Sequence, residues 1–416
     1  MEKEFDVIVL GAGIVGVSVA NHLQRRGRRV VLVDRREPGE ETSFGNAGVL
    51  SRGSIVPVAF PGLIRKLPRY AFNRRVEMRI APTFLPAILP WLMQLMRNTT
   101  EERSREISKA LDALLARTVV EHKALMSPSG AYTYLREAGW LKLHRTNRSL
   151  DAASHERSLL AKFDIKHTLL QREDIMDLEP HLAPLYVGGT HIVDTASVSN
   201  PSAVTKAYAA LFTKEGGTLL KGDAASFRWM ARIWRIDTER GMLSAPDAVV
   251  CLGPWSTDVL EPLGYHLPFA VERGYHTHFA PKGNAVLNRP VYDADGGFVL
   301  APMDRGIRLS TGIEFAPRDA RPTPKQLRKV IPKAQRVFPL GELLDDKPWL
   351  GRRPSFPDSL PIIGRAPNHR GLWAAFGHGH IGFSAGPVTG RLLAEMLTGT
   401  RTSIDPKPYA MERFLG

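Results

Sequence analysis

Residues near the start of the chain have the types and spacing needed to hold a phosphorylated ligand. Residues 5–10 read FDVIVL, a continuous apolar run, and Gly11, Gly13 and Gly16 follow in the pattern G-x-G-x-x-G. Gly11 permits a tight turn, Gly13 admits a pyrophosphate next to the backbone, and Gly16 lets a helix pack close to the strand. A helix that opens with Ile14 and Val15 presents free N–H groups and its positive dipole end to the phosphates.

A carboxylate with the spacing of a ribose ligand follows this pattern. Asp34 ends the apolar run VVLVD, 18 residues after Gly16. A dinucleotide site commonly has an acid near this spacing, where it binds ribose hydroxyls. Arg35 and Arg36 come next and would suit a 2′-phosphate, but Asp34 would repel one. The motif predicts dinucleotide binding and by itself does not separate NAD from FAD.

The end of the chain repeats the same strand, glycine turn and helix. Residues 373–397 read WAAFGHGHIGFSAGPVTGRLLAEML. If both turns belong to one domain, they can hold one long cofactor from two sides. The isoalloxazine ring of FAD needs backbone donors at its pyrimidine edge, and a helix N-terminus there would stabilise negative charge on reduced flavin. NAD has no evident need for a second turn, so FAD is favoured.

The composition is ordinary for a globular protein, and it limits the expected compartment and partners. The chain has 416 residues, 43% hydrophobic and 24% charged, with a net charge of +14. The single cysteine, Cys251, excludes an internal disulfide framework and indicates a reducing compartment. The basic residues are spread along the chain without aromatic interleaving, so a nucleic-acid partner is not expected. MEKEF leads directly into a strand, and no run of 18 apolar residues occurs. We expect a cytoplasmic protein, with peripheral contact to the inner face of the membrane left open.

The elements that must position these residues predict an α/β protein with two interleaved domains. Residues 247–260 repeat the strand, glycine and helix unit a third time, whereas residues 269–312 are rich in strands and turns. We expect a doubly wound, three-layer Rossmann-like FAD domain from residues 1–85, 187–265 and 347–416. An α+β substrate domain on a mixed or antiparallel sheet would comprise residues 86–186 and 266–346.

Residues 60–98 are first basic and then apolar. This composition suits an interfacial membrane contact, which a dehydrogenase passing electrons to membrane quinone would use. It equally suits an active-site lid or a buried helix of the substrate domain. A docking surface for partner subunits is a third interpretation.

Several motifs in this order resemble one enzyme family along essentially the whole chain. They are VIVLGAGIVGVSVANHL with VVLVDR, TSFGNAG, CLGPWS, GRRPSFPDSLPIIG and GHGHIGFSAGPVTGRLLAEML. They resemble the D-amino acid oxidase/dehydrogenase superfamily of FAD enzymes, in particular its bacterial D-amino acid dehydrogenase branch, which extends to D-hydroxyproline dehydrogenase-like members. The resemblance implies FAD, held non-covalently here because the last turn lacks the cysteine to which some relatives attach it.

The resemblance also assigns roles to residues. It implies FAD contacts at Gly11, Gly13, Ile14, Val15, Gly16, Asp34, Arg35, Ser43, Asn46, Ala47, Gly48, Ala224, Gly253, Gly377, His380, Ile381 and Gly382. Arg353 of GRRP would bind the substrate carboxylate, a task for which its planar fork and permanent charge suit it, or it would be a surface arginine beside Arg352. Tyr275 would contact substrate or be an ordinary strand residue, and His378 would contact substrate or shape the turn. His276 and His278 share a strand face but lack a third ligand, so no metal site is expected.

The implied reaction is the oxidation of an amino acid at Cα, followed by hydrolysis of the imine to a keto acid and ammonia. The branch often has NAGQVSPG where this chain has NAGVLSRG, so Val49 and Arg52 would alter the substrate side or point to solvent. A D-proline or hydroxyproline-like substrate is one interpretation. Oxidation of sarcosine or glycine, amine oxidation on tRNA, and a flavin-binding subunit without its own activity are alternatives. A dehydrogenase with an acceptor other than oxygen, a membrane quinone or a partner subunit, is favoured, and oxygen stays open as the alternative.

Overall fold

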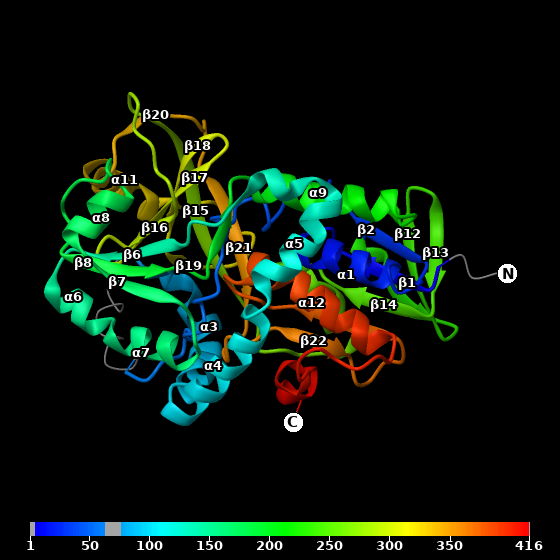
Figure 1. Ribbon diagram of the computed structural model, residues 1–416. Helices are drawn as coiled ribbons and strands as arrows, with labels where there is room; N and C mark the ends of the chain where they lie inside the picture. Colours follow the sequence, from blue (N-terminus) through cyan, green and yellow to red (C-terminus); the bar gives the residue numbers. More distant parts are fainter. Residues whose placement is uncertain (1–4, 63–75, 416) are drawn as a thin grey trace.

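The computed structural model describes residues 5–62 and 76–415 (Figure 1). A six-stranded sheet has the order β10-β2-β1-β14-β23-β22. Its strands are β1 (Val7–Leu10), β2 (Val30–Asp34), β10 (Thr218–Lys221), β14 (Asp247–Val250), β22 (Ile362–Arg365) and β23 (Leu372–Phe376). Every neighbouring pair is parallel except β22 with β23, which is antiparallel. Strands from both ends of the chain thus belong to one sheet, in which β14 lies between β1 and β23.

The six-stranded sheet is the middle of three layers because side chains of β1 alternate between its two faces. Val7 and Val9 pack into a core with helices, whereas Ile8 and Leu10 pack into a second core with the three-stranded antiparallel sheet. The helices are α1 (Ile14–Gln24), α4 (Glu101–Leu115), α5 (Thr118–Ser129), α9 (Pro201–Lys214) and α12 (Gly382–Leu397). The small sheet contains β11 (Arg228–Met230), β12 (Ile233–Thr238) and β13 (Gly241–Ala245).

Helices α1 and α12, the first and last α-helices of the described chain, pack directly on one another. A Cβ atom on Gly390 would lie 2.6 Å from a backbone carbon of Ser18. A Cβ atom on Gly386 would lie 3.0 Å from the Ile14 side chain. The two glycines, four residues apart on one face of α12, allow this close approach. The helix N-termini that follow β1 and β23 are therefore brought to the same end of the sheet.

The second large element is a mixed sheet of 11 strands. At its centre β15 (Ala270–Pro281) pairs with β18 (Gly306–Thr311) and β19 (Ile313–Phe315), and also with β20 (Leu340–Leu343) and β21 (Trp349–Ser355). The remaining strands are β4 (Met78–Ile80), β6 (Trp140–His144), β7 (His167–Gln171), β8 (Gly188–Ile192), β16 (Val291–Asp293) and β17 (Phe298–Met303). Helix α11 (Lys325–Val337) packs on one face with Tyr275 and Phe279.

This architecture confirms the predicted fold class of a Rossmann-like domain combined with a mixed-sheet domain. The residue ranges of the two domains stay a prediction. Strands β4, β8 and β21 fall in ranges assigned to the FAD domain, yet they pair within the 11-stranded sheet. A third small sheet joins β3 (Val49–Leu50), β9 (Ala196–Val198) and β5 (Leu135–Arg136).

The segment of residues 60–98 is described only in part, because residues 63–75 lie outside the described residues. Helix α3 (Leu85–Arg97) buries Ile88, Trp91 and Leu95 and exposes Leu89 and Met93. The other helices are α6 (Asn147–Ala152), α7 (Ser154–Lys162), α8 (Arg172–Leu178) and α10 (Ser256–Leu260). Of the helices in residues 5–62 and 76–415, none combines the length and the apolar character that a bilayer crossing requires.

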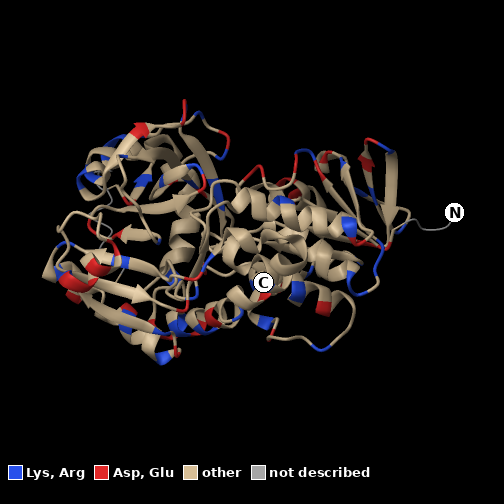
Figure 2. Ribbon diagram, turned by 45° about the horizontal axis from the view of Figure 1, so that its top comes forward, with Lys and Arg blue, Asp and Glu red and all other residues tan. Residues whose placement is uncertain are grey.

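Charged side chains of both signs are interspersed over the molecule. Figure 2 shows Lys and Arg alternating with Asp and Glu along the helices and loops of both halves. The net charge of +14 is thus distributed and, in this view, does not form one continuous basic face.

Candidate functional site

A cavity of about 410 Å³ lies between the carboxyl ends of the parallel strands and one face of the 11-stranded sheet. Open α/β sheets bind ligands at the carboxyl ends of their strands. The sequence-predicted residues that line it are Gly11, Gly13, Ile14, Val15, Asp34, Arg35, Ser43, Asn46, Ala224, Gly253, Tyr275, Arg353, His378, His380 and Gly382. Gly16, Ala47, Gly48, Gly377 and Ile381 lie outside its lining. Residues from eight separated segments of the chain are therefore brought together.

The first glycine turn is shaped by close backbone packing. Gly11 has φ +100°, and a Cβ there would lie 2.6 Å from the carbonyl oxygen of Cys251. A Cβ on Gly16 would overlap the carbonyl oxygen of Gly11. Gly13 has more room, since its nearest neighbour would be the Ser43 hydroxyl at 3.4 Å. Gly11 and Gly16 thus hold helix α1 against the turn, and Gly13 leaves the cavity wall open.

Polar groups around this turn are oriented toward the cavity. Asp34 accepts hydrogen bonds from the backbone N–H groups of Ala12 at 2.6 Å and Arg36 at 2.9 Å. The Ser43 hydroxyl accepts one from the N–H of Ile14 at 3.0 Å. These bonds fix a carboxylate and a hydroxyl beside a helix N-terminus, which has no acidic residue in its first turn. The arrangement fits a ligand with a pyrophosphate and a ribose.

The loop after β2 and the third turn complete this wall. Asn46 accepts a hydrogen bond from the N–H of Gly48 at 2.8 Å through its side chain. Gly48 has φ +75°, and a Cβ there would overlap the carbonyl oxygen of Val198. Gly48 therefore shapes the loop, whereas a Cβ on Gly253 would meet no atom within 4 Å. Because Gly253 has no side chain, the cavity beside it stays open.

The second glycine turn combines cavity-lining and packing residues. The His378 ring bonds the Thr389 hydroxyl at 3.0 Å, and burial lowers the pKa of His378 to about 3, so its ring is neutral. His380 is open to the cavity, and burial among protein groups and the charge of Arg353 lower its pKa. Gly377 packs against Phe356, and together with Ile381 it lines a smaller chamber of about 20 Å³.

Arg353 is a half-buried cation that faces the cavity from β21. Burial lowers the pKa of Arg353, and the charge of Glu272 opposes this effect. Its guanidinium forms no ion pair with any carboxylate in the part of the chain that the structure describes, and the carbonyl of Thr311 lies 3.5 Å away. A charge that is partly removed from water and has no close counter-ion is costly, so this site favours an anionic ligand.

Tyr275 and Arg352 point away from Arg353 because neighbouring residues of a strand alternate in direction. The Tyr275 hydroxyl donates to Glu314 at 2.9 Å and accepts from the N–H of Thr323 at 2.7 Å. Tyr275 also packs in the core beneath α11. This geometry favours the interpretation of Tyr275 as an ordinary strand residue. It lines the cavity only because β15 forms part of the cavity wall. Arg352 donates to the carbonyl of Arg318 at 3.0 Å.

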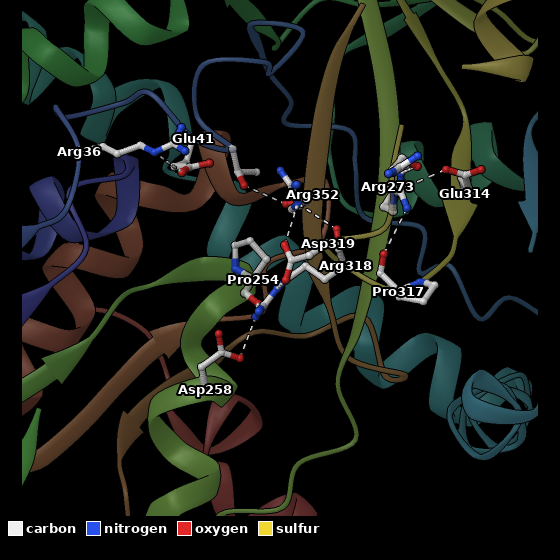
Figure 3. Close-up of polar contacts among 12 residues, drawn as sticks. Arg36, Glu41, Pro254, Asp258, Arg273, Glu314, Pro317, Arg318, Asp319 and Arg352 are labelled. Carbon is white, nitrogen blue, oxygen red and sulfur yellow. Dashed lines mark hydrogen bonds and ion pairs between the residues drawn. The ribbon is translucent and has the colours of Figure 1, made fainter. Parts of the chain in front are cut away.

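The rim of the cavity is held by a polar network that sequence reasoning missed (Figure 3). Arg318 donates to the carbonyl of Pro254 at 3.1 Å and to Asp258 at 2.8 Å. The hydroxyl of Thr42 donates to the carbonyl of Arg352 at 2.9 Å. In Figure 3, Arg352, Asp319 and Arg318 lie in one row between these contacts. The network joins the loop after β19 to the start of α10.

Aromatic side chains on the cavity wall were also missed. The guanidinium carbon of Arg35 lies 4.9 Å from the ring centroid of Trp255. The Trp349 ring stacks on the His276 ring, with 4.8 Å between their centroids. The His278 ring bonds Asp345 at 2.8 Å. Within the described residues, no group of three or more His, Cys, Asp or Glu side chains is placed to hold a metal ion.

Arg52, which replaces a proline of the related branch, is directed away from this cavity. It pairs with Asp112 of α4 at 2.5 Å and donates to the carbonyl of Phe163 at 3.3 Å. Neither Arg52 nor Val49 is among the lining residues. The expectation that Arg52 would alter the substrate side therefore has no support in the structure.

Comparison with known proteins identifies the family. A family model described as FAD dependent oxidoreductase matches residues 6–396. The chain belongs to this family. It is 32% identical to a D-amino-acid oxidase from Bradyrhizobium diazoefficiens, over 98% of this chain and 99% of the relative. It is 31% identical to a D-amino acid dehydrogenase from Chromohalobacter salexigens, again over 98% and 99%.

Solved structures share the fold of this chain. Glycine oxidase from Geobacillus kaustophilus is 22% identical, with a TM-score of 0.73 over 99% of each chain. L-proline dehydrogenase from P. horikoshii is 19% identical, with a TM-score of 0.74 over 99% of this chain and 98% of that one. The chain is thus an FAD-dependent oxidoreductase, and the open glycine cradle and the fixed Asp34 carboxylate fit this cofactor.

Proposed function

We propose that this protein oxidises a D-amino acid at Cα, as a dehydrogenase that passes electrons to an acceptor other than oxygen. The observation that carries the proposal is Arg353, a half-buried guanidinium that lines the cavity beside the second glycine turn and has no carboxylate partner among the described residues. An amino acid brings the carboxylate that this charge requires. The curated relatives support the D-configuration, since they are a D-amino-acid oxidase and D-amino acid dehydrogenases with 30–32% identity.

The protein's part in the reaction is mainly positioning. FAD, when bound, supplies the acceptor for the hydride that leaves Cα. Arg353 would hold the substrate carboxylate through its planar fork, which fixes the orientation of Cα. The first turn, with Gly13, Asp34 and Ser43, would bind the pyrophosphate and ribose. The N-terminus of α12, at Gly382, would place positive dipole charge where the reduced cofactor gathers negative charge.

The binding mode and the acceptor belong to this proposal. We propose non-covalent FAD, because Cys251, the single cysteine of the chain, is buried at the end of β14 and precedes the last turn by more than 100 residues. A membrane quinone or a partner subunit would take the electrons. Among substrates we propose a cyclic D-amino acid such as D-proline or a hydroxyproline isomer as the first to test. Sarcosine or glycine would use the same clamp. The interspersed charges in Figure 2 do not favour tRNA.

The test is anaerobic bleaching of the flavin spectrum. Purified protein is mixed with D-proline, cis-4-hydroxy-D-proline, D-alanine, D-arginine, sarcosine and the matching L-forms. Rapid bleaching by D-forms alone, lost in Arg353→Leu, is expected. Bleaching by sarcosine and glycine alone would replace the D-amino acid by a secondary amine or glycine. An intact flavin spectrum with every candidate would overturn the proposal.

A further inference from the structure

Glu272 is a buried carboxylate next to the proposed substrate clamp. It lies on β15 directly opposite Arg353 of β21, so the two side chains share one face of the sheet. Glu272 is 4% exposed. The Ser355 hydroxyl donates a hydrogen bond to its carboxylate. In the described parts of the chain Glu272 forms no ion pair, and Arg353 acts on it through its charge alone.

Glu272 lines the smaller chamber, which adjoins the main cavity. The chamber has a volume of about 20 Å³, room for about one water molecule. Its polar lining consists of Ser54, Glu272, Ser355, Ser359, His378 and His380. His378, Gly379 and His380 line both spaces. A water molecule there would connect the carboxylate with the place where the substrate Cα must lie.

The proposed reaction creates a need for such a group. A free amino acid enters a neutral solution as an ammonium ion. Hydride leaves Cα readily only when the nitrogen lone pair can form the C=N bond, so the ammonium must first lose a proton. A general base must lie within hydrogen-bond reach of that proton, directly or through one water.

Building on the proposed function, we propose that Glu272 accepts the ammonium proton of the bound substrate, directly or through a water in the chamber. The N–H bond breaks, an O–H bond forms on the Glu272 carboxylate, and the nitrogen keeps the electron pair. With this lone pair free, the C=N bond could form as hydride leaves Cα, and bound FAD would supply the hydride acceptor. Substrate enters as a zwitterion, and the site ends this proton step with a neutral amine, a neutral Glu272 and Arg353 bound to the substrate carboxylate.

The charges around Glu272 make this transfer depend on substrate. Burial raises the pKa of Glu272, and the charge of Arg353 and the Ser355 bond oppose the rise. When a carboxylate neutralises Arg353, the pKa of Glu272 rises further, so the base strengthens as substrate arrives. The other titratable groups on the chamber are His378 and His380, whose pKa values are lowered. Across the strand pair, β19 places Phe315 opposite Glu272, and the charged Glu314 and Arg273 lie on the other face.

The first experiment compares wild type with Glu272→Gln, a nearly isosteric change. The rate constant for anaerobic flavin reduction should fall about 10²-fold near neutral pH in Glu272→Gln. It should then rise with pH toward the pKa of the substrate's own ammonium. Glu179→Gln is the matched control, since Glu179 is fully buried, has a raised pKa and lines neither space. It should keep the wild-type pH profile.

The second experiment needs no turnover. Sodium propionate, a carboxylate without an amine, is added to the flavin-loaded protein in weakly buffered solution with a pH indicator. Wild type and Glu179→Gln should take up protons on binding, and Glu272→Gln should not. Absence of proton uptake in wild type, or an unchanged pH profile in Glu272→Gln, would overturn this role while bleaching by D-amino acids still supports the proposed function. Failure of every amino acid to bleach wild type would overturn both.

Discussion

The backbone of Gly274 lies against the guanidinium of Arg353, so closely that a Cβ on Gly274 would be 2.8 Å from a guanidinium nitrogen. The Arg353 guanidinium thus packs on the backbone of β15. Any side chain at position 274 must displace it. The relationship explains a glycine in the middle of a long buried strand, where glycine otherwise weakens a sheet.

Gly274→Ala should shift Arg353 and weaken substrate binding while FAD stays bound. We expect KM for the best D-amino acid to rise about tenfold or more, corresponding to a loss of about 1.4 kcal/mol. Steady-state kinetics and the flavin spectrum measure the two effects. Val271→Ala, on the same strand but outside the cavity lining, is the control. An unchanged KM in Gly274→Ala would show that Arg353 does not carry substrate binding.

Arg353→Lys should impair the enzyme although it keeps the charge. Lysine cannot form two parallel hydrogen bonds with a carboxylate, so both orientation and affinity are lost. We expect kcat/KM to fall about 10²-fold, equivalent to about 2.7 kcal/mol. Arg352→Lys, the adjacent residue directed to the other side of β21, should give a clearly smaller decrease. Equal decreases in the two variants would contradict the assignment of Arg353.

Asp34→Ala should lower the affinity for FAD without a large loss of folded protein. The carboxylate is fixed by two backbone N–H groups, so we expect it to bind the ribose hydroxyls through charge-assisted hydrogen bonds. Losing these bonds should raise the Kd for FAD roughly 10- to 100-fold. Fluorescence titration of apoprotein with FAD measures it. Asp237→Ala, at an exposed ion pair with Arg228, should leave the Kd unchanged.

Gly390→Ala should destabilise the fold more than Gly386→Ala. The added methyl at Gly390 meets the backbone of Ser18 in α1, which cannot yield, whereas at Gly386 it meets the side chain of Ile14. We expect the free energy of unfolding to fall by about 1–3 kcal/mol for Gly390→Ala. Denaturant titration of both variants checks the order. The reverse order would mean that α1 and α12 can separate at low cost.

Acid should destabilise the protein through buried neutral histidines. His122 joins three helices, since its ring bonds the Tyr208 hydroxyl at 3.0 Å and the Phe383 carbonyl at 2.9 Å. Burial lowers the pKa of His122 from 6.5 to about 4. Below pH 6.5 the unfolded state therefore binds the extra proton, and stability falls as the pH decreases from 6.5 toward 4.

In the variant His122→Gln, the unfolded state no longer binds this extra proton. Between these pH values its free energy of unfolding should lose up to about 1.4 kcal/mol less per pH unit than wild type. Urea titrations at several pH values provide the slopes. His155→Gln, at an exposed side chain, is the control. A wild-type slope in His122→Gln would show that another group dominates acid unfolding.

The sequence allowed the glycine turns and the fold class to be predicted because both depend on short local patterns. Gly11 to Gly16 and Asp34 lie within one strand, helix and strand unit, and the chemistry of each is local. The faces of β15 were not accessible in this way. Whether Tyr275 or Glu272 faces the cavity depends on the register of β15 with β21, some 80 residues later. No local signal marks Glu272 or Trp349, and Arg52 was misjudged because its partner Asp112 lies in α4.

Because α1 packs on α12, the two glycine turns can come together only late in the synthesis of the chain. The first turn leaves the ribosome early, but the helix that completes the cradle ends at Leu397. At about 5–20 residues per second, roughly 20 seconds to more than a minute of translation separate the two. During that interval β1 first lacks its neighbour β14, and β14 then lacks its neighbour β23, so one apolar edge of the sheet stays unpaired. The proposed FAD site, which uses both glycine turns, would therefore be complete only after α12 has been made.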